Sequence, residues 1–156
     1  MNNLYELVYD LMGKDESNKQ FQLLSSIVEE TPNIYLDHKH SREYFYSKSG
    51  IALSFMKAMN CFAFAFFHIA TNMVKSGNVT MYRGNLPNEI TVTDGPVEIE
   101  EKMSQKPISS ELGAAHPGDK PTLWIKYRSG EVIVGFAFTD SVLELVSLTY
   151  KPERMD

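Results

Sequence analysis

The stretch Tyr44-Phe45-Tyr46-Ser47-Lys48-Ser49-Gly50-Ile51 decides the fold, because the second half of the chain contains a matching stretch, Trp124-Ile125-Lys126-Tyr127-Arg128-Ser129-Gly130-Glu131. Each copy is followed by an apolar run, and both have the pattern of strand, turn and strand. When the Ser-Gly pairs are aligned, the copies are 80 residues apart (130 minus 50), about half of the 156-residue chain. The repeat predicts an α+β protein of two tandem modules, each made of short helices packed on antiparallel sheet.

We therefore divide the chain into an N-terminal helix-plus-sheet module, residues 1–80, and a C-terminal helix-plus-sheet module, residues 81–156. Hydrophobic residues make up 43% of the chain, which suffices for one core or for two small cores that share an interface. The two modules are expected to form one compact unit.

Hydrophobic spacing and turn residues place the elements of both modules. The N-terminal module is expected to have helices over 3–12 and from about 17 to 30, and strands over 34–36, 43–47, 51–56 and 62–66. Residues 71–79 fit either a strand or a loop. The second is expected to have a connector over 81–87, a brief strand over 90–92, a helix over 96–103, a loop over 106–121, and strands over 122–128, 131–138 and 142–150.

The composition limits the classes of partner and the compartment. With 20 acidic and 15 basic residues the net charge is −5, which disfavours nucleic acids and anionic membranes and favours a basic or neutral partner. The single cysteine, Cys61, stands in an apolar run and is expected to be a buried free thiol in the cytoplasm. The N-terminus lacks a secretory signal, and residues 51–70 contain Lys57, Asn60 and His68, so we interpret them as two strands and not a membrane span.

Groups for catalysis or metal binding are few. Cys61 and His68 form a weak candidate for a thiolate–imidazole pair, since phenylalanines flank the thiol. His38 and His40 alternate on one face of a strand, but a metal site would need a further ligand such as His116. Phosphate-loop, hydrolase and zinc signatures are absent from the sequence. We therefore expect no enzyme activity, no metal and no cofactor.

Aromatic and basic residues share one face of the predicted hairpins. Trp124, Lys126 and Arg128 alternate on one side of their strand, and the Ser-Gly alignment gives Tyr44, Tyr46 and Lys48 the equivalent positions. Such residues either belong to the core or serve as anchors in a protein interface. The acidic residues of the predicted helix over 96–103 and of the turn before it suit the positive end of the helix dipole or a basic partner. The candidate partner-binding residues are Tyr44, Tyr46, Trp124, Lys126, Asp94, Glu98 and Glu101.

The centre of the chain resembles a bacterial protein family. The phrase Tyr82-Arg83-Gly84-Asn85-Leu86-Pro87, followed by Thr93-Asp94, an acidic helix ending in Lys102-Met103, and Lys106-Pro107, is similar to immunity proteins encoded beside contact-dependent or other polymorphic toxins. The chain has Asn88-Glu89 where that family commonly has a glycine, and Met103-Ser104 where it commonly has Leu-Gly. The resemblance implies a cytoplasmic, non-catalytic protein that binds and blocks a cognate toxin domain.

A basic nuclease is the class of toxin that the acidity of the chain would suit. Two alternatives stay open at this point: a small enzyme or ligand-binding protein that uses its phenylalanine-rich interior as a pocket, and an adaptor subunit of a secretion-associated complex. The two copies of the repeat differ at Tyr46 and Lys126 and at Ile51 and Glu131. We therefore expect a partner to engage one module more than the other.

Overall fold

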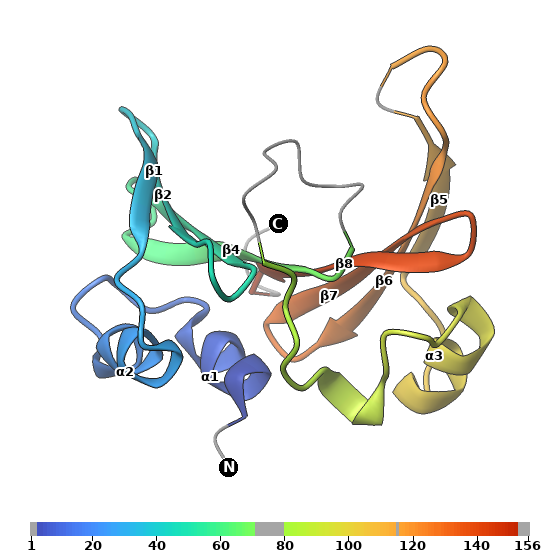
Figure 1. Ribbon diagram of the computed structural model, residues 1–156, viewed down its shortest axis with the longest axis horizontal. Coiled ribbons are helices and arrows are strands. Elements are labelled where there is room, and N and C mark those ends of the chain that lie inside the picture. Colours follow the sequence, from blue (N-terminus) through green and yellow to red (C-terminus); the bar gives the residue numbers. More distant parts are fainter. Residues whose placement is uncertain (1–2, 71–79, 115, 153–156) are drawn as a thin grey trace.

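The computed structural model describes residues 3–70, 80–114 and 116–152, and strands dominate it (Figure 1). The elements of the first half are α1 (Leu4–Leu11), α2 (Lys19–Val28), β1 (Asn33–Asp37), β2 (Ser41–Tyr46), β3 (Ile51–Met56) and β4 (Cys61–His68). Those of the second half are the 3-10 helix η2 (Pro87–Glu89), α3 (Pro96–Met103), β5 (Ser109–Gly113), β6 (Thr122–Ser129), β7 (Val132–Thr139) and β8 (Val142–Tyr150).

The eight strands of the described residues belong to one antiparallel sheet with the order β1-β2-β3-β4-β8-β7-β6-β5. The prediction of two tandem modules of helices packed on sheet is therefore wrong. Each half of the chain contributes a four-stranded meander, but β4 pairs directly with β8, so the meanders are continuous. β8 is buried over residues 143–148, and β4 buries Phe62, Ala65 and Phe67 on one face, as expected of central strands.

The helices follow from their caps and apolar spacing. The Asn3 side chain accepts a hydrogen bond from the Glu6 N–H and starts α1, and Asn18 does the same for α2 through Gln20. α3 begins with Pro96 in its first turn and ends at Ser104, whose backbone is left-handed. Each helix buries only one to three residues, so its position depends on packing against the sheet.

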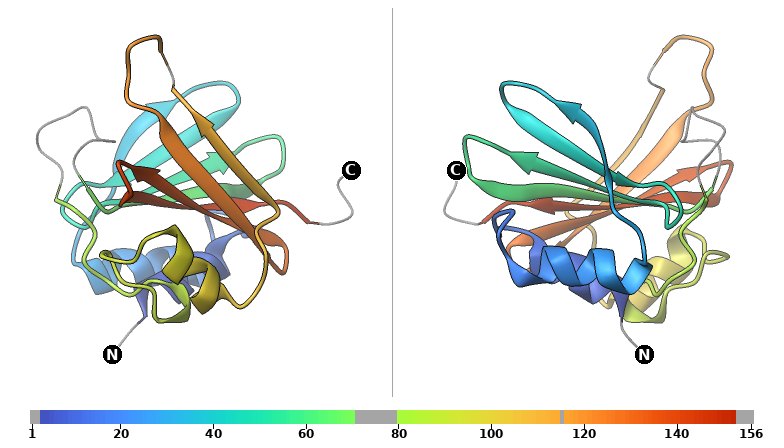
Figure 2. Two further views of the ribbon diagram at one scale, coloured as in Figure 1. Left: turned by 90° about the vertical axis from the view of Figure 1, so that its right-hand side faces the viewer. Right: turned by 60° about the vertical axis from the view of Figure 1, so that its left-hand side comes forward.

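All three α-helices lie on the same face of the sheet (Figure 2). Cross-strand pairing defines two rows of side chains on that face, which form the centre of the core. One row contains Tyr46, Ile51, Phe67, Val146, Phe136 and Ile125, and the other Tyr44, Leu53, Ala65, Leu148, Val134 and Tyr127. Among the described residues no α-helix covers the other face, which we call the helix-free face.

Most element positions agree with the predictions, including the three α-helices and every strand except β5. Two predictions are wrong. Residues 90–92 do not form a strand, and the predicted loop over 106–121 contains β5, whose exposed residues lack an apolar alternation. Residues 71–79 lie outside the described part of the chain. Residues 51–70 contain β3 and β4, as expected, and none of the described helices is long and apolar enough to span a membrane.

Candidate protein-binding surfaces

Trp124 and Lys126 lie on the helix-free face, on strand β6. Their neighbours Ile125 and Tyr127 point into the core, so alternation turns Trp124 and Lys126 to the opposite side. Trp124 is half-buried and Lys126 is exposed. The predicted pairing of an aromatic and a basic side chain on one face is therefore present in the second half of the chain.

The Trp124 ring lies over a glycine, Gly135, in the neighbouring strand β7. A Cβ atom at Gly135 on β7 would lie 3.6 Å from Cε3 and Cζ3 of the Trp124 ring. An aromatic ring that covers a strand glycine in this way shields the backbone there. The ring is thus held against the sheet, which lowers the entropy that it would lose on binding.

Cross-strand pairs give the other residues of the helix-free face. Both edges of the sheet curve toward this side, so the face is concave (Figure 1). Its partly exposed rings come from β2, β4 and β6, and small residues lie between them in the central strands. The half-buried rings are Phe45, Phe64, Phe66, His68 and Trp124, and the small residues are Ala52, Ser147, Gly135 and Ala137.

The phenylalanines of this face were not identified from the sequence. Strict alternation would place Phe62, Phe64 and Phe66 on one side of their strand. The register shifts at Ser54 and Phe55, so that β4 contains a bulge at Ala63 and Phe62 turns to the helix side. Phe62 packs there against Phe21 of α2, with ring centroids 4.8 Å apart, while Phe64 and Phe66 remain on the helix-free face.

Tyr44 and Tyr46 do not share a face with Trp124, contrary to the prediction from the repeat. Tyr46 pairs with Ile51 across a four-residue turn, whereas Ser129 pairs with Val132 across a two-residue turn. Aligning the strand ends gives an offset of 83 residues (129 minus 46) and not 80. An odd change of register moves every side chain to the opposite face. Tyr44 therefore corresponds to Tyr127, in the core.

Both tyrosines are packed against helix α2. Tyr46 is fully buried, and its hydroxyl and Ser25 Oγ share a hydrogen bond of 3.0 Å. Burial raises the pKa of Tyr46 to about 12. The Tyr44 ring lies 4.9 Å from the Phe21 ring between centroids, and its hydroxyl donates to Glu16. Burial and this contact raise the pKa of Tyr44. Neither ring is free to contact a partner.

The predicted acidic candidates have different surroundings. Asp94 accepts hydrogen bonds from Lys102 Nζ at 2.6 Å and from the Thr91 N–H at 2.9 Å, so it fixes the start of α3. The hydrogen bond from Lys102 lowers the pKa of Asp94 most, and the hydrogen bond from the Thr91 N–H lowers it further. Glu98 and Glu101 are exposed on α3, and no described residue forms a salt bridge with them. They lie on the helix side of the sheet, so the structure does not bring them together with Trp124 and Lys126.

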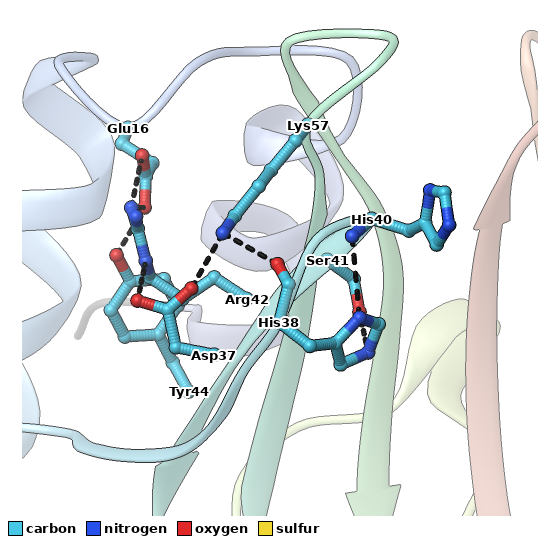
Figure 3. A network of polar contacts seen from close by, with 8 residues as sticks. All are labelled: Glu16, Asp37, His38, His40, Ser41, Arg42, Tyr44 and Lys57. Carbon is cyan, nitrogen blue, oxygen red and sulfur yellow. Dashed lines mark hydrogen bonds and ion pairs between the residues drawn. The ribbon is translucent and has the colours of Figure 1, made fainter.

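A network of polar contacts ties strand β1 and the β2 edge to the loop before α2 (Figure 3). Arg42 donates to both Glu16 oxygens, at 2.8 and 2.7 Å, and to Asp37 at 3.2 Å. Lys57 Nζ donates to Asp37 at 2.6 Å. The hydrogen bond from Lys57 lowers the pKa of Asp37 most, and the hydrogen bond from Arg42 lowers it further. Every charge of the network has a partner within it, which is typical of a structural clamp.

The ring of His38, which belongs to this network, also has hydrogen-bond partners. His38 Nε2 and Ser41 Oγ are 2.8 Å apart, and His38 Nδ1 accepts a hydrogen bond from the His40 N–H at 3.2 Å (Figure 3). Both ring nitrogens of His38 are therefore occupied. Within residues 3–70, 80–114 and 116–152, no group of three or more His, Cys, Asp or Glu side chains is placed to hold a metal ion.

The structure separates the candidate nucleophile from its base. Cys61 and His68 are the first and last residues of β4, which places them on the order of 20 Å apart. Burial raises the pKa of the Cys61 thiol, so the less reactive thiol form is favoured. Burial also lowers the pKa of His68. The two groups cannot act together on one substrate atom.

Comparison with known proteins gives a likeness in fold to a solved structure. No family model matches the sequence, and no curated protein matches it. The fold resembles the crystal structure of a DUF4309 family protein, YjgB, from Bacillus subtilis subsp. subtilis str. 168, with a TM-score of 0.54 and 12% sequence identity. The likeness covers 96% of this chain and 94% of that one. At this identity the likeness extends to the fold alone.

Proposed function

We propose that this protein acts by stoichiometric binding, as a cytoplasmic immunity protein that covers a cognate toxin domain with the helix-free face of its sheet. The observation that carries the proposal is the position of Trp124, half-buried beside exposed Lys126 on a face that no described helix covers. Tryptophan is among the residue types that most often dominate the binding energy of protein interfaces.

The shape of the face also suits a protein partner. Its rings come from strands of both meanders and surround small side chains, so a protruding element of a partner can approach the backbone between them. Aromatic side chains on strands lose little conformational entropy on binding. The net charge of −5 would increase the association rate with a basic toxin, such as a nuclease.

The backbone supports the resemblance to immunity proteins at the two places where the sequence differs from them. Asn88 and Glu89 have φ values of 55° and 60°, and Ser104 has a φ of 55°. These are left-handed conformations, which glycine adopts most readily. Both departures thus occur where a glycine would fit the same backbone.

Residues of the stretch 82–87, on which the resemblance to immunity proteins rests, also have structural roles. Tyr82 is buried and its hydroxyl donates to the Asn85 carbonyl at 2.6 Å, while Leu86 is in the core. A Cβ atom at Gly84 would lie 2.4 Å from the Tyr82 hydroxyl oxygen, so this position requires glycine unless Tyr82 moves. The phrase is therefore explained by packing of the connector, and it leaves the binding surface to other residues.

The proposal requires that a toxin gene lies beside the gene for this protein. Replacing Trp124 by alanine then tests binding to the toxin domain that this gene would encode. We expect Trp124→Ala to weaken the complex by about 2 kcal/mol or more, roughly 30-fold in Kd, measured by calorimetry. Cells that co-express the toxin and this variant should lose protection. Tyr46→Phe is the matched control, since its ring is buried on the helix side and its affinity should not change. Unchanged affinity of Trp124→Ala with a native circular dichroism spectrum would reject this binding face.

A further inference from the structure

A groove of about 480 Å³ opens on the helix side of the molecule, between α1 and the segment that contains η2 and α3. One wall belongs to α1, the other to η2, the last turn of α3 and the residue that follows its cap, and β6 and β7 supply the floor. The lining residues are Tyr5, Glu6, Tyr9, Asp10, Pro87, Asn88, Met103, Gln105, Ser129 and Val134.

The charge of this groove is negative. Glu6 and Asp10 are both exposed and line it, and no lysine or arginine does. No described cation forms a salt bridge with either carboxylate. Since they are four residues apart on a helix, the two side chains lie next to each other on one face. A single bound cation could contact both.

The placement of Asp10 lowers the stability of the free protein. It lies in the last turn of α1, where the helix dipole disfavours a negative charge, and that turn contains no basic residue. The like charge of Glu6 one turn earlier adds to the cost. A cation in the groove would relieve both effects, so binding and stability are linked at this residue.

The aromatic lining favours a flat cation over a compact one. Tyr9 is half-buried, and its hydroxyl donates to the Ser129 carbonyl at 2.7 Å, which fixes the ring at the base of the groove. Tyr5 lies beside it, with ring centroids 6.2 Å apart. Tyr5 is buried, so Tyr9 is the ring that a ligand can reach. A guanidinium group stacks on such a ring and donates hydrogen bonds to two carboxylates at once, which an ammonium group cannot do equally well.

We propose that this groove binds an arginine side chain of a partner polypeptide. It lies on the opposite face of the sheet from Trp124, so the inference does not rest on the proposed toxin-binding face. The arginine enters between α1 and η2, its guanidinium group contacts Glu6 and Asp10, and its plane lies against Tyr9. The volume of the groove also admits residues on either side of the arginine.

Titration with short peptides tests this site by amide NMR. The probe is the blocked tripeptide acetyl-Gly-Arg-Gly-amide, and the same peptide with lysine is the comparison. We expect saturable shifts centred on Tyr9, Met103 and Gln105, and weaker binding of the lysine peptide. In Glu6→Gln/Asp10→Asn, affinity for the arginine peptide should fall at least about fivefold. This variant should unfold at the same temperature as the wild type or higher.

A second pair of acidic residues supplies the matched control. Glu98→Gln/Glu101→Gln removes the same charge from the exposed face of α3, away from the groove, and should leave the affinity unchanged. Equal weakening in both double variants would overturn the proposal, because it would show attraction to net charge alone. Equal affinity for the lysine peptide, or shifts centred on Glu98 and Glu101 and not on the groove, would overturn it too.

Discussion

The hydroxyl group of Tyr46 ends a fully buried side chain and shares a hydrogen bond with Ser25 of α2. Tyr46→Phe removes this bond and keeps the ring, so we expect a loss of about 1 kcal/mol in the free energy of unfolding. Tyr46→Ala also leaves a cavity and should cost about 3–5 kcal/mol. Urea denaturation measures both. A loss below about 1 kcal/mol for Tyr46→Ala would contradict its place in the core.

Asp94 makes the stability of the protein depend on pH. Its pKa in the folded protein lies below its ordinary value because Lys102 and the Thr91 N–H donate to it. Its contribution is therefore complete above the pKa of the unfolded chain, about 3.9, and is lost as the pH falls through the folded pKa. In Lys102→Gln the decrease in stability between pH 7 and pH 3 should be smaller than in the wild type. Equal decreases, measured by urea denaturation, would exclude this role.

Residue types alone did not decide which aromatic side chains are buried. Tyr46 and Trp124 both precede a Ser-Gly pair and alternate with apolar residues, but the two turns differ by two residues in length. The turn length fixes the register and hence the face of every side chain in the hairpin. Trp124 and Lys126 were placed together correctly because they lie on the same strand, where alternation suffices.

At the scale of elements, the two glycines of the repeated phrase are predicted to differ in importance. Gly50 and Gly130 have φ values of 69° and 60°, so alanine at either should cost about 1–2 kcal/mol for the left-handed backbone. A Cβ atom at Gly50 would also lie 2.5 Å from the Tyr82 backbone nitrogen, whereas one at Gly130 would have only the Tyr9 hydroxyl at 3.3 Å.

Gly50→Ala must therefore displace the connector that crosses the β2–β3 turn, and we expect it to cost at least about 3 kcal/mol in total. Gly130→Ala is the control, with a cost near the backbone value. Chemical denaturation of the two variants measures the difference. Equal losses of stability would show that the connector does not pack against the turn at Gly50 as described.

Elements with strong periodicity or clear turns could be located from the sequence, as the helix over 96–103 and the strands from 122 to 150 show. β5 could not, because it is an exposed edge strand whose pairing depends on β6 and not on its own pattern. The bulge at Ala63 could not be predicted from the sequence either, since an extra residue in a strand leaves its composition unchanged.

At the scale of the whole molecule, two meanders form one sheet through the pairing of β4 and β8. Sequence repetition indicated two halves, but local patterns do not specify which strand of one half will pair with which strand of the other. Because all three α-helices pack on one side, the two sides of the molecule differ in chemistry (Figure 2). The helix side has the acidic groove, and the other side has the aromatic residues around Trp124.

Trp124 is the single tryptophan of the chain, so fluorine NMR of protein labelled with 5-fluorotryptophan gives one signal from the proposed anchor. Addition of the unlabelled toxin domain should shift or broaden this signal and saturate at one equivalent, while the arginine peptide should leave it unchanged. An unchanged signal in a stoichiometric complex with the toxin would show that the helix-free face near Trp124 is not where the protein binds.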